Sequence, residues 1–316
     1  MARYIDPATD FGFKRIFKDE EITRGFLNAL LQSEYPNMNI TKVTITDGEL
    51  DESHKDIRRV VYDVHCVTDD GSEFVIEMQN ESQEFFPERI VYYLSRAASR
   101  QQDKGLIDFT GNDGKNKKKP WDYHLKNIYG VFFMNFKDEV HYKGLSRFAL
   151  METSDHYIDT EVFQYWKIQM PYYKTMKESD CKTDIDKWIF KLSNMNTMET
   201  SLSFANEIPL FMRLGSIASY SELTPQQQVA YDDSYHNYVS YHGQMEYKYN
   251  KGREEGREEG RAEGLSQGMA QGMAQQLLEN VRNLMSSGFD FDKAVELLKI
   301  PADKIESLRE MVMNEK

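Results

Sequence analysis

The stretch VVYDVHCVTDDGSEFVIEMQ, residues 60–79, contains two runs of strand-forming residues on either side of a short polar turn. The first run covers residues 60–67 and the second covers residues 73–79. In each run, apolar side chains alternate with a set that includes acids, which is the period of a strand with two different faces. The segment therefore predicts a β-hairpin that carries carboxylates on one face.

The length of the turn decides which residues oppose each other across this hairpin. A two- or four-residue loop would oppose Asp63 to Met78 and place charges on the apolar side. A three-residue loop, with Gly71 in the left-handed conformation as a bulge, instead opposes Asp63 to Glu77 and keeps each face consistent. In that register Gln79 lies one pleat further along the same face. The pattern favours the three-residue loop.

Two opposed carboxylates, with Cβ atoms about 5 Å apart, repel each other unless a cation lies between them. Oxygen-only ligands suit Mg²⁺ or Mn²⁺, which keep several waters and can activate one of them. The sequence thus makes Asp63 and Glu77 candidate metal ligands. The alternative is that both acids lie on the solvent-exposed face of a one-sided sheet.

The flanking segments predict an α/β core around the hairpin. Helical periodicity covers residues 9–32, and a short strand is expected at 39–45. A helix opens at Pro87 and ends near Gly105, followed by a loop over residues 110–120. The apolar run at 127–136 indicates a strand covered on both faces, and residues 165–170 are a candidate for another strand.

The second half of the chain is helical in pattern from about Lys182. Thr224, Pro225 and Gln227 form a capping-box arrangement that starts a helix. Glycine then recurs every fourth residue, at Gly252, Gly256, Gly260, Gly264, Gly268 and Gly272. Each glycine costs about 1 kcal/mol relative to alanine in a helix, so close contact with a partner helix is the physical candidate for offsetting that cost. A marginal, solvated connector is the alternative.

Residues 277–316 predict three short amphipathic helices. Their order is similar to a helix-turn-helix, but the last helix carries only Lys304 and Arg309 as cations against three acids, so it suits phosphate contact poorly. We interpret this segment as a small packing or dimer-end module.

Composition limits the class of protein. The chain has 316 residues with 40% hydrophobic and 13% aromatic residues, which describes a folded protein. Its two cysteines are far apart and no apolar leader or membrane span is recognisable, so we expect a reducing cytoplasm. The net charge of −13 argues against coating nucleic acid through a bulk positive field, although a local patch or a bound cation can reverse the sign at a site.

Four segments resemble a known family. They are TDFGFKRIF at residues 9–17, IEMQ at 76–79, FPERIVYYLSR at 86–96 and GREEGREEG at 252–260. Together they are similar to the recombination-promoting nucleases, also described as PD-(D/E)XK family transposases. The resemblance implies a PD-(D/E)XK restriction-endonuclease-like core, a mixed sheet flanked by helices, with a helical C-terminal region. It also implies a Mg²⁺-dependent (or Mn²⁺-dependent) DNA endonuclease.

Carried over by position, the resemblance makes Asp63 and Glu77 metal ligands and puts Gln79 in the place of the catalytic lysine. Glutamine has no charge and cannot act as a general base, so it can only orient the attacking water or contact phosphate. Another cation must then help to stabilise the transition state.

Further residues are candidates for that site. Asp10 and Lys14 lie one helical turn apart and can both face it, although an ordinary ion pair would have the same spacing. Arg89 and Arg96 lie on the helix after the hairpin at a spacing that suits phosphate contact and equally suits a solvated face. His65 shares a face with Asp63 and could be a ligand or base, or could merely line the site.

The sequence therefore predicts four parts: a nuclease core at residues 1–180, a helical region at 181–250, an oligomerisation helix at 251–276 and a C-terminal module at 277–316. The expected partners are DNA and a second copy of the chain, since a dimer with two active sites suits double-strand cleavage. The alternative is a catalytically idle nuclease fold that binds nucleic acid or assembles. The missing lysine and the acidic net charge leave that alternative open.

Overall fold

The computed structural model describes residues 4–46, 61–103, 106–110, 116–120, 123–138, 142–198, 202–205 and 207–313, with only the backbone course given for 102–103, 106–110 and 116–120. The chain divides into two compact units, Met1–Tyr238 and Val239–Lys316, and each is described by itself.

The first unit combines one sheet with helices. Its strands are β1 (Val43–Thr46), β2 (Val64–Thr68), β3 (Glu73–Gln79), β4 (Leu106–Thr110), β5 (Asn116–Pro120), β6 (Ile128–Met134), β7 (Leu145–Met151) and β8 (Ile158–Gln169). Its helices are α1 (Asp10–Phe17), α2 (Glu20–Gln32), α3 (Phe86–Asp103), α4 (Met170–Thr175), α5 (Asp184–Asn194) and α6 (Leu210–Ile217), with three short 3₁₀ turns and the start of α7 (Pro225–Ser286).

Six strands form a mixed sheet in the order β1-β2-β3-β6-β8-β7. The pairs β1–β2, β2–β3 and β7–β8 are antiparallel, whereas β3–β6 and β6–β8 are parallel. Every residue of β6 is buried, as the apolar run at 127–136 predicts. The hairpin β2–β3 therefore continues into the centre of the sheet, and its end lies beside the end of β6.

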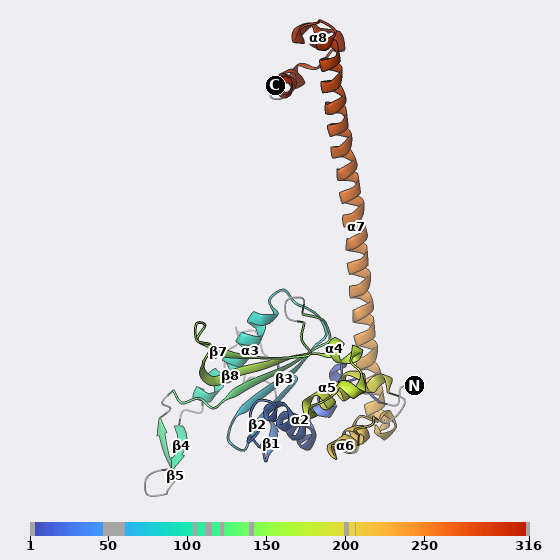
Figure 1. Ribbon diagram of the computed structural model, residues 1–316. Helices are drawn as coiled ribbons and strands as arrows, with labels where there is room; N and C mark the ends of the chain where they lie inside the picture. The colour runs from blue at the N-terminus through green and yellow to red at the C-terminus, as the bar shows by residue number, and fades with distance from the viewer. Residues whose placement is uncertain are drawn as a thin grey trace. The chain divides into compact units, whose positions relative to one another are not determined.

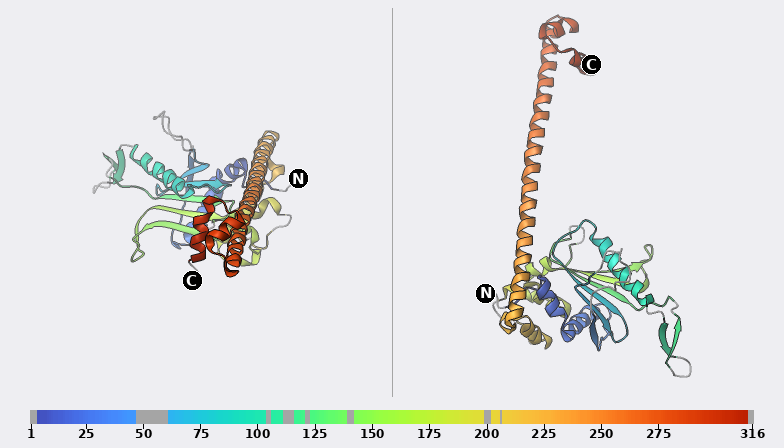
Figure 2. Two further views of the ribbon diagram at one scale, coloured as in Figure 1. Left: turned by 90° about the horizontal axis from the view of Figure 1, so that it is seen from above. Right: turned by 180° about the vertical axis from the view of Figure 1, so that it is seen from behind.

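Helices cover both faces of this sheet. Figures 1 and 2 show α3 on one side and α2 on the other. The α3 side packs Ile90 and Leu94 against Val75 and Phe132. A larger core on the opposite side combines α1, α2, α5 and α6 with the alternate residues of the strands, such as Ile76. Because both faces are buried, any acid on the hairpin is taken out of bulk solvent unless it lies at a strand end.

The hairpin has the predicted register. Val64 pairs with Ile76 and Cys66 with Phe74. Gly71 has φ 85°, and its N–H donates to the carbonyl of Thr68 over 3.0 Å, which closes the three-residue loop. The alternation breaks before β2, because the chain bends at Asp63. Tyr62 therefore packs on the α3 side instead of the side expected from the strand period.

Two predictions about the outer strands were wrong. The expected loop over 110–120 contains β5, which pairs with β4 as a separate two-stranded sheet. The sequence also gave no indication of β7, which forms the edge of the main sheet beside β8. Strand β5 is polar and strand β7 is half-exposed. Each of them forms because its backbone pairs with a neighbouring strand, and not because its sequence has an apolar period.

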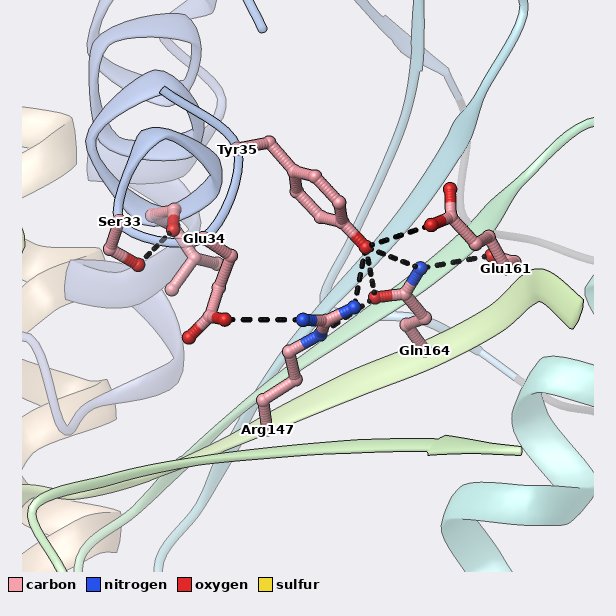
Figure 3. Close-up of polar contacts among 7 residues, drawn as sticks. Ser33, Glu34, Tyr35, Arg147, Glu161 and Gln164 are labelled. Carbon is pink, nitrogen blue, oxygen red and sulfur yellow. Dashed lines mark hydrogen bonds and ion pairs between the residues drawn. The ribbon is translucent and has the colours of Figure 1, made fainter. Parts of the chain in front are cut away.

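A partly exposed polar cluster joins the segment after α2 to the outer strands (Figure 3). The guanidinium of Arg147 on β7 donates through Nε to Gln164 of β8 over 2.9 Å and through Nη1 to Glu34 over 3.1 Å. It also donates to the hydroxyl of Tyr35 and stacks on that ring. These partners satisfy the guanidinium, so we assign the cluster a structural role.

The second unit contains the rest of α7 together with α8 (Phe291–Leu298) and α9 (Ala302–Met313). Helix α7 starts with the predicted capping box, in which Thr224 and Gln227 exchange hydrogen bonds. A small core of Val281, Ala294, Ile300 and Leu308 joins the last turns of α7 to the two short helices. No helix within the described residues is both long enough and apolar enough to cross a membrane.

Candidate active site

Two acids meet where the hairpin strands come together beside β6. The backbone N–H of Asp63 donates to Glu77 Oε1 over 3.0 Å, and the backbone N–H of Met78 donates to Asp63 Oδ2 over 2.8 Å. Each carboxylate is thus held by the backbone of the opposite strand. The predicted juxtaposition of Asp63 and Glu77 is present, and it follows from the register that Gly71 sets.

Burial of this acid pair lowers the stability of the folded protein. Glu77 is only 2% exposed, and Asp63 is half-buried. The interpretation that both acids lie on a solvent-exposed face is therefore wrong. Desolvation, reinforced by the charge of Asp63, raises the pKa of Glu77 from its ordinary value of 4.5 to about 8. Desolvation also raises the pKa of Asp63. Without a bound cation, ionisation of both carboxyl groups at the same time is therefore unfavourable.

Two cations approach the pair from different helices. Lys14 comes from α1, where it forms a 2.6 Å ion pair with Asp10. Burial lowers the pKa of Lys14, but Asp10, Asp63 and Glu77 outweigh that effect and raise it. Arg89 comes from α3, and its charge opposes the upward pKa shifts of both acids. One cation from each side of the sheet therefore acts on the charge of the acid pair.

Gln79 joins the acid pair to Arg89. Its side-chain oxygen accepts from Arg89 Nη1 over 3.2 Å, and its Nε2 lies 3.4 Å from Glu77 Oε2. Gln79 is itself only 6% exposed. The amide that replaces the motif lysine is thus fixed at both ends, and the guanidinium of Arg89 supplies a positive charge next to it.

Sequence reasoning missed two residues that position Arg89. The hydroxyl of Tyr93 accepts from Arg89 Nη2 over 2.8 Å, and the guanidinium lies 4.9 Å from the centre of that ring. Gln83 accepts from Arg89 Nη1 over 3.0 Å. The spacing of four residues between Arg89 and Tyr93 on a helix was the signal for the first contact. Gln83 precedes the helix and no pattern distinguishes it.

Two other candidates make no contact with Asp63 or Glu77 among the described residues. Arg96 is seven residues beyond Arg89 on α3, about 10 Å along the helix axis, and the described residues show no contact between it and either acid. The buried Nε of Arg96 has no hydrogen-bond partner in this part of the chain. His65 is engaged at both ring nitrogens, with the hydroxyl of Thr46 at Nδ1 and the carboxylate of Glu73 at Nε2. These contacts leave His65 no free nitrogen for a metal.

The donor atoms fit a hard divalent cation. Asp63 Oδ1 accepts no hydrogen bond from the described residues, and the contact to Glu77 Oε2 is long. Among the described residues no group of three or more His, Cys, Asp or Glu side chains could hold a metal ion. Two carboxylates that leave the other positions to water and phosphate oxygens are the ligand set typical of Mg²⁺.

The raised pKa of Glu77 predicts a pH dependence of stability in the presence of a chelator. Between about pH 4.5 and 8 the folded protein keeps a proton that the unfolded chain releases, so the free energy of unfolding falls as pH rises. We expect the melting temperature in chelator to be lower at pH 8 than at pH 5, and this drop should be larger in the wild type than in Glu77→Gln. The difference between the two drops should be about 2 to 4 °C or more, since a change of about 1 kcal/mol shifts the melting temperature by that amount in a domain of this size. Parallel melting curves for the two proteins would contradict the assignment.

Comparison with known proteins gives the family. A family model described as PD-(D/E)XK nuclease family transposase matches residues 7–247, a segment that contains the sheet, the acid pair, Lys14 and Arg89. A comparison with curated proteins and one with solved structures find no match. The mixed sheet flanked by helices, followed by a helical C-terminal region, confirms the expected α/β core of PD-(D/E)XK type. On the extent of that match, the chain belongs to the PD-(D/E)XK nuclease family transposases.

Proposed function

We propose that this chain is a metal-dependent DNA endonuclease with a role in recombination or mobile-element movement, and that it works in the cytoplasm. The observation that carries this proposal is the pair formed by Asp63 and the buried Glu77, on which the charges of Lys14 and Arg89 act. Such a pair is a liability for stability alone, and it is what binding of Mg²⁺ or Mn²⁺ requires. Both cysteines are free and buried, which suits a reducing compartment.

The residues divide the chemistry between them. A divalent cation held by Asp63 and Glu77 would polarise the phosphate and lower the pKa of a bound water. Gln79, fixed between Glu77 and Arg89, orients that water by hydrogen bonds without taking its proton. Lys14 and Arg89 face the phosphate as negative charge builds on its oxygens. Asp10 holds Lys14 in place through their ion pair, so we assign it a positioning role.

An idle nuclease fold is the second candidate, favoured by Gln79 in place of a lysine and by the net charge of −13. The position of Arg89 supports the enzyme, because a guanidinium beside Gln79 restores the charge that the motif lacks. Conversion of supercoiled plasmid by the full chain, in Mg²⁺ or Mn²⁺ and in chelator, tests the choice.

The two arginines of α3 are expected to differ in their effect. Arg89→Gln removes the charge next to Gln79, so the cleavage rate at saturating DNA should fall by about 10²- to 10³-fold. Arg96→Gln makes the same chemical change about 10 Å further along the helix, and should weaken DNA binding with little effect on the saturated rate. Single-turnover cleavage at increasing protein concentration separates the two effects. If both variants lose the same factor in the saturated cleavage rate, Arg89 has no role in the cleavage step beyond that of Arg96.

We also propose that two copies assemble through α7. None of the six glycines from Gly252 to Gly272 has another group within 4 Å of an added Cβ, so no contact with the described residues explains them. Beside them Leu265, Met269 and Met273 are more than half exposed at the same spacing of four. The helix also alternates Arg253, Arg257 and Arg261 with glutamates, which makes its surface complementary in charge to a second copy of itself.

The four-residue period sets the hand of this contact. A helix has 3.6 residues per turn, so the glycine stripe winds by about 40° at each repeat. Two straight helices could follow it for only a few repeats. Helices that follow a period longer than 3.6 cross with a right-handed twist, so we expect a right-handed pair.

A further inference from the structure

A groove of about 720 Å³ lies along α1, and Lys14 is part of its lining. One wall is α1, from Asp10 to Lys18, and the other is formed by Ile217 at the end of α6 and by the first turns of α7. The groove belongs entirely to the first unit of the chain. It is separate from the arginine face of α3, which packs on the opposite side of the sheet.

Cations dominate the lining of this groove. Lys14, Arg15 and Lys18 all come from α1 or its C-cap. Arg15 uses only Nε, which donates to the carbonyl of Ile217 over 2.8 Å, and the described residues offer no partner to its two terminal nitrogens. Lys18 is exposed and likewise has no ion-pair partner in the described part of the chain. The terminal groups of two cations are therefore available to a ligand.

The acids of the groove do not cancel this charge. Asp19 is already held by Arg213, whose Nη2 lies 2.6 Å from its Oδ2. Asp10 is paired with Lys14. The neutral residues can add hydrogen-bond donors, since Gln227 and Ser234, which carry an amide and a hydroxyl group, also line the groove. A set of cations and neutral donors matches a ligand that offers only acceptors, which is the chemistry of phosphate.

Lys14 links the groove to the candidate active site. That side chain lines the groove and also acts on the pKa values of Asp63 and Glu77. A phosphodiester held at the acid pair would thus have Arg89 and Arg96 toward one side of the sheet and Lys14, Arg15 and Lys18 toward the other.

We propose that the groove between α1 and α7 binds the phosphate backbone of the substrate DNA on the side of the cut that α3 does not serve. This inference rests on the proposed function and adds to it a second half of the binding track. Lys18 and the terminal nitrogens of Arg15 contact phosphates, whereas the edges of the bases are not read by this lining. The groove therefore contributes affinity that falls with salt and does not depend on sequence.

The test measures binding of a 20-base-pair duplex of arbitrary sequence to the full chain carrying Asp63→Asn, which prevents turnover. Dissociation constants are determined between about 50 and 200 mM salt. Lys18→Gln should reduce the slope of log affinity against log salt by about 0.9, the value for one phosphate contact. The matched control is Lys42→Gln. Lys42 directly precedes β1, and the first residue of β1 pairs with Thr68. Lys42 therefore lies at the turn end of the hairpin. Thr68 is five residues along the strand from Asp63, so the control is remote from the acid pair.

A second pair of variants adds a charge instead of removing one. Ala230 lines the groove, and the exposed Val229 is its neighbour on α7, turned about 100° away and not part of the lining. Ala230→Glu should weaken binding about two- to fivefold, the effect of one exposed charge pair, while Val229→Glu leaves it unchanged. Melting curves check that all four variants fold.

The outcomes separate this inference from the proposed function. If the parent protein binds the duplex with a salt-dependent affinity and the wild type cleaves, but Lys18→Gln matches Lys42→Gln and Ala230→Glu matches Val229→Glu, the groove does not bind DNA and the active site stands. If the parent binds no duplex at any salt concentration, the proposed function fails and the groove assignment fails with it.

Discussion

Replacing Asp63 with asparagine is expected to remove cleavage while making the metal-free protein more resistant to heat. Asparagine keeps an oxygen that can accept from the N–H of Met78, so the strand contact survives. It removes the negative charge that raises the pKa of Glu77 and that repels its carboxylate. The cleavage rate should fall by at least about 10²- to 10³-fold, because the group lost acts on the transition state. Calorimetry in chelator should give a higher melting temperature than for the wild type.

The matched control for this change is Asp159→Asn. Asp159 is an exposed residue at the start of β8, and that strand runs parallel to β6 and β3. It therefore lies at the opposite end of the sheet from the acid pair, and the same substitution there should alter neither cleavage nor melting. Wild-type cleavage by Asp63→Asn, or a lower melting temperature in chelator than that of Asp159→Asn, would remove Asp63 from the site.

Assembly should respond as strongly to changes in the glycine stripe. We expect the triple change of Gly256, Gly260 and Gly264 to leucine to convert a dimeric or larger chain to a monomer. An added Cβ at these positions meets none of the described residues within 4 Å, and leucine is the better helix former by about 1 kcal/mol per residue. The helix content of the variant, measured by circular dichroism, should therefore rise or stay equal while association is lost.

Gly243→Leu provides the control for that experiment. Gly243 also lies on α7 with nothing near an added Cβ, but it falls outside the four-residue period. Sedimentation of both full-length variants beside the wild type gives the result. If the triple variant sediments with the wild type, the stripe is not the interface and α7 serves as a connector.

The sequence allowed the hairpin to be predicted in detail because two local rules act there together. Alternation fixed the faces, and only a loop with Gly71 in the left-handed region kept Asp63 opposite Glu77. The buried run of β6 was equally clear. The bend at Asp63 was not predictable, because the core that receives Tyr62 is made by α3, which follows later in the chain.

Other parts depend on contacts that no local pattern reports. Strand β7 exists because β8 pairs with it, and β5 because β4 does. At the site, the spacing of Asp10 and Lys14 indicated an ion pair, and the structure shows one. That the same lysine acts on Asp63 follows from how α1 packs against the sheet. The groove between α1 and α7 joins residues more than two hundred positions apart, which explains why sequence reasoning did not find it.

The central claim is that Asp63 and Glu77 hold a divalent cation with which this chain cuts DNA, and the most direct test is plasmid conversion by the purified full-length wild type. Supercoiled DNA is incubated with the protein in Mg²⁺, in Mn²⁺ and in excess chelator, and nicked and linear products are followed over time. We predict that both products accumulate with either metal and that neither accumulates in chelator. Equal cleavage in chelator, or no cleavage with either metal by protein that binds the plasmid, would contradict it.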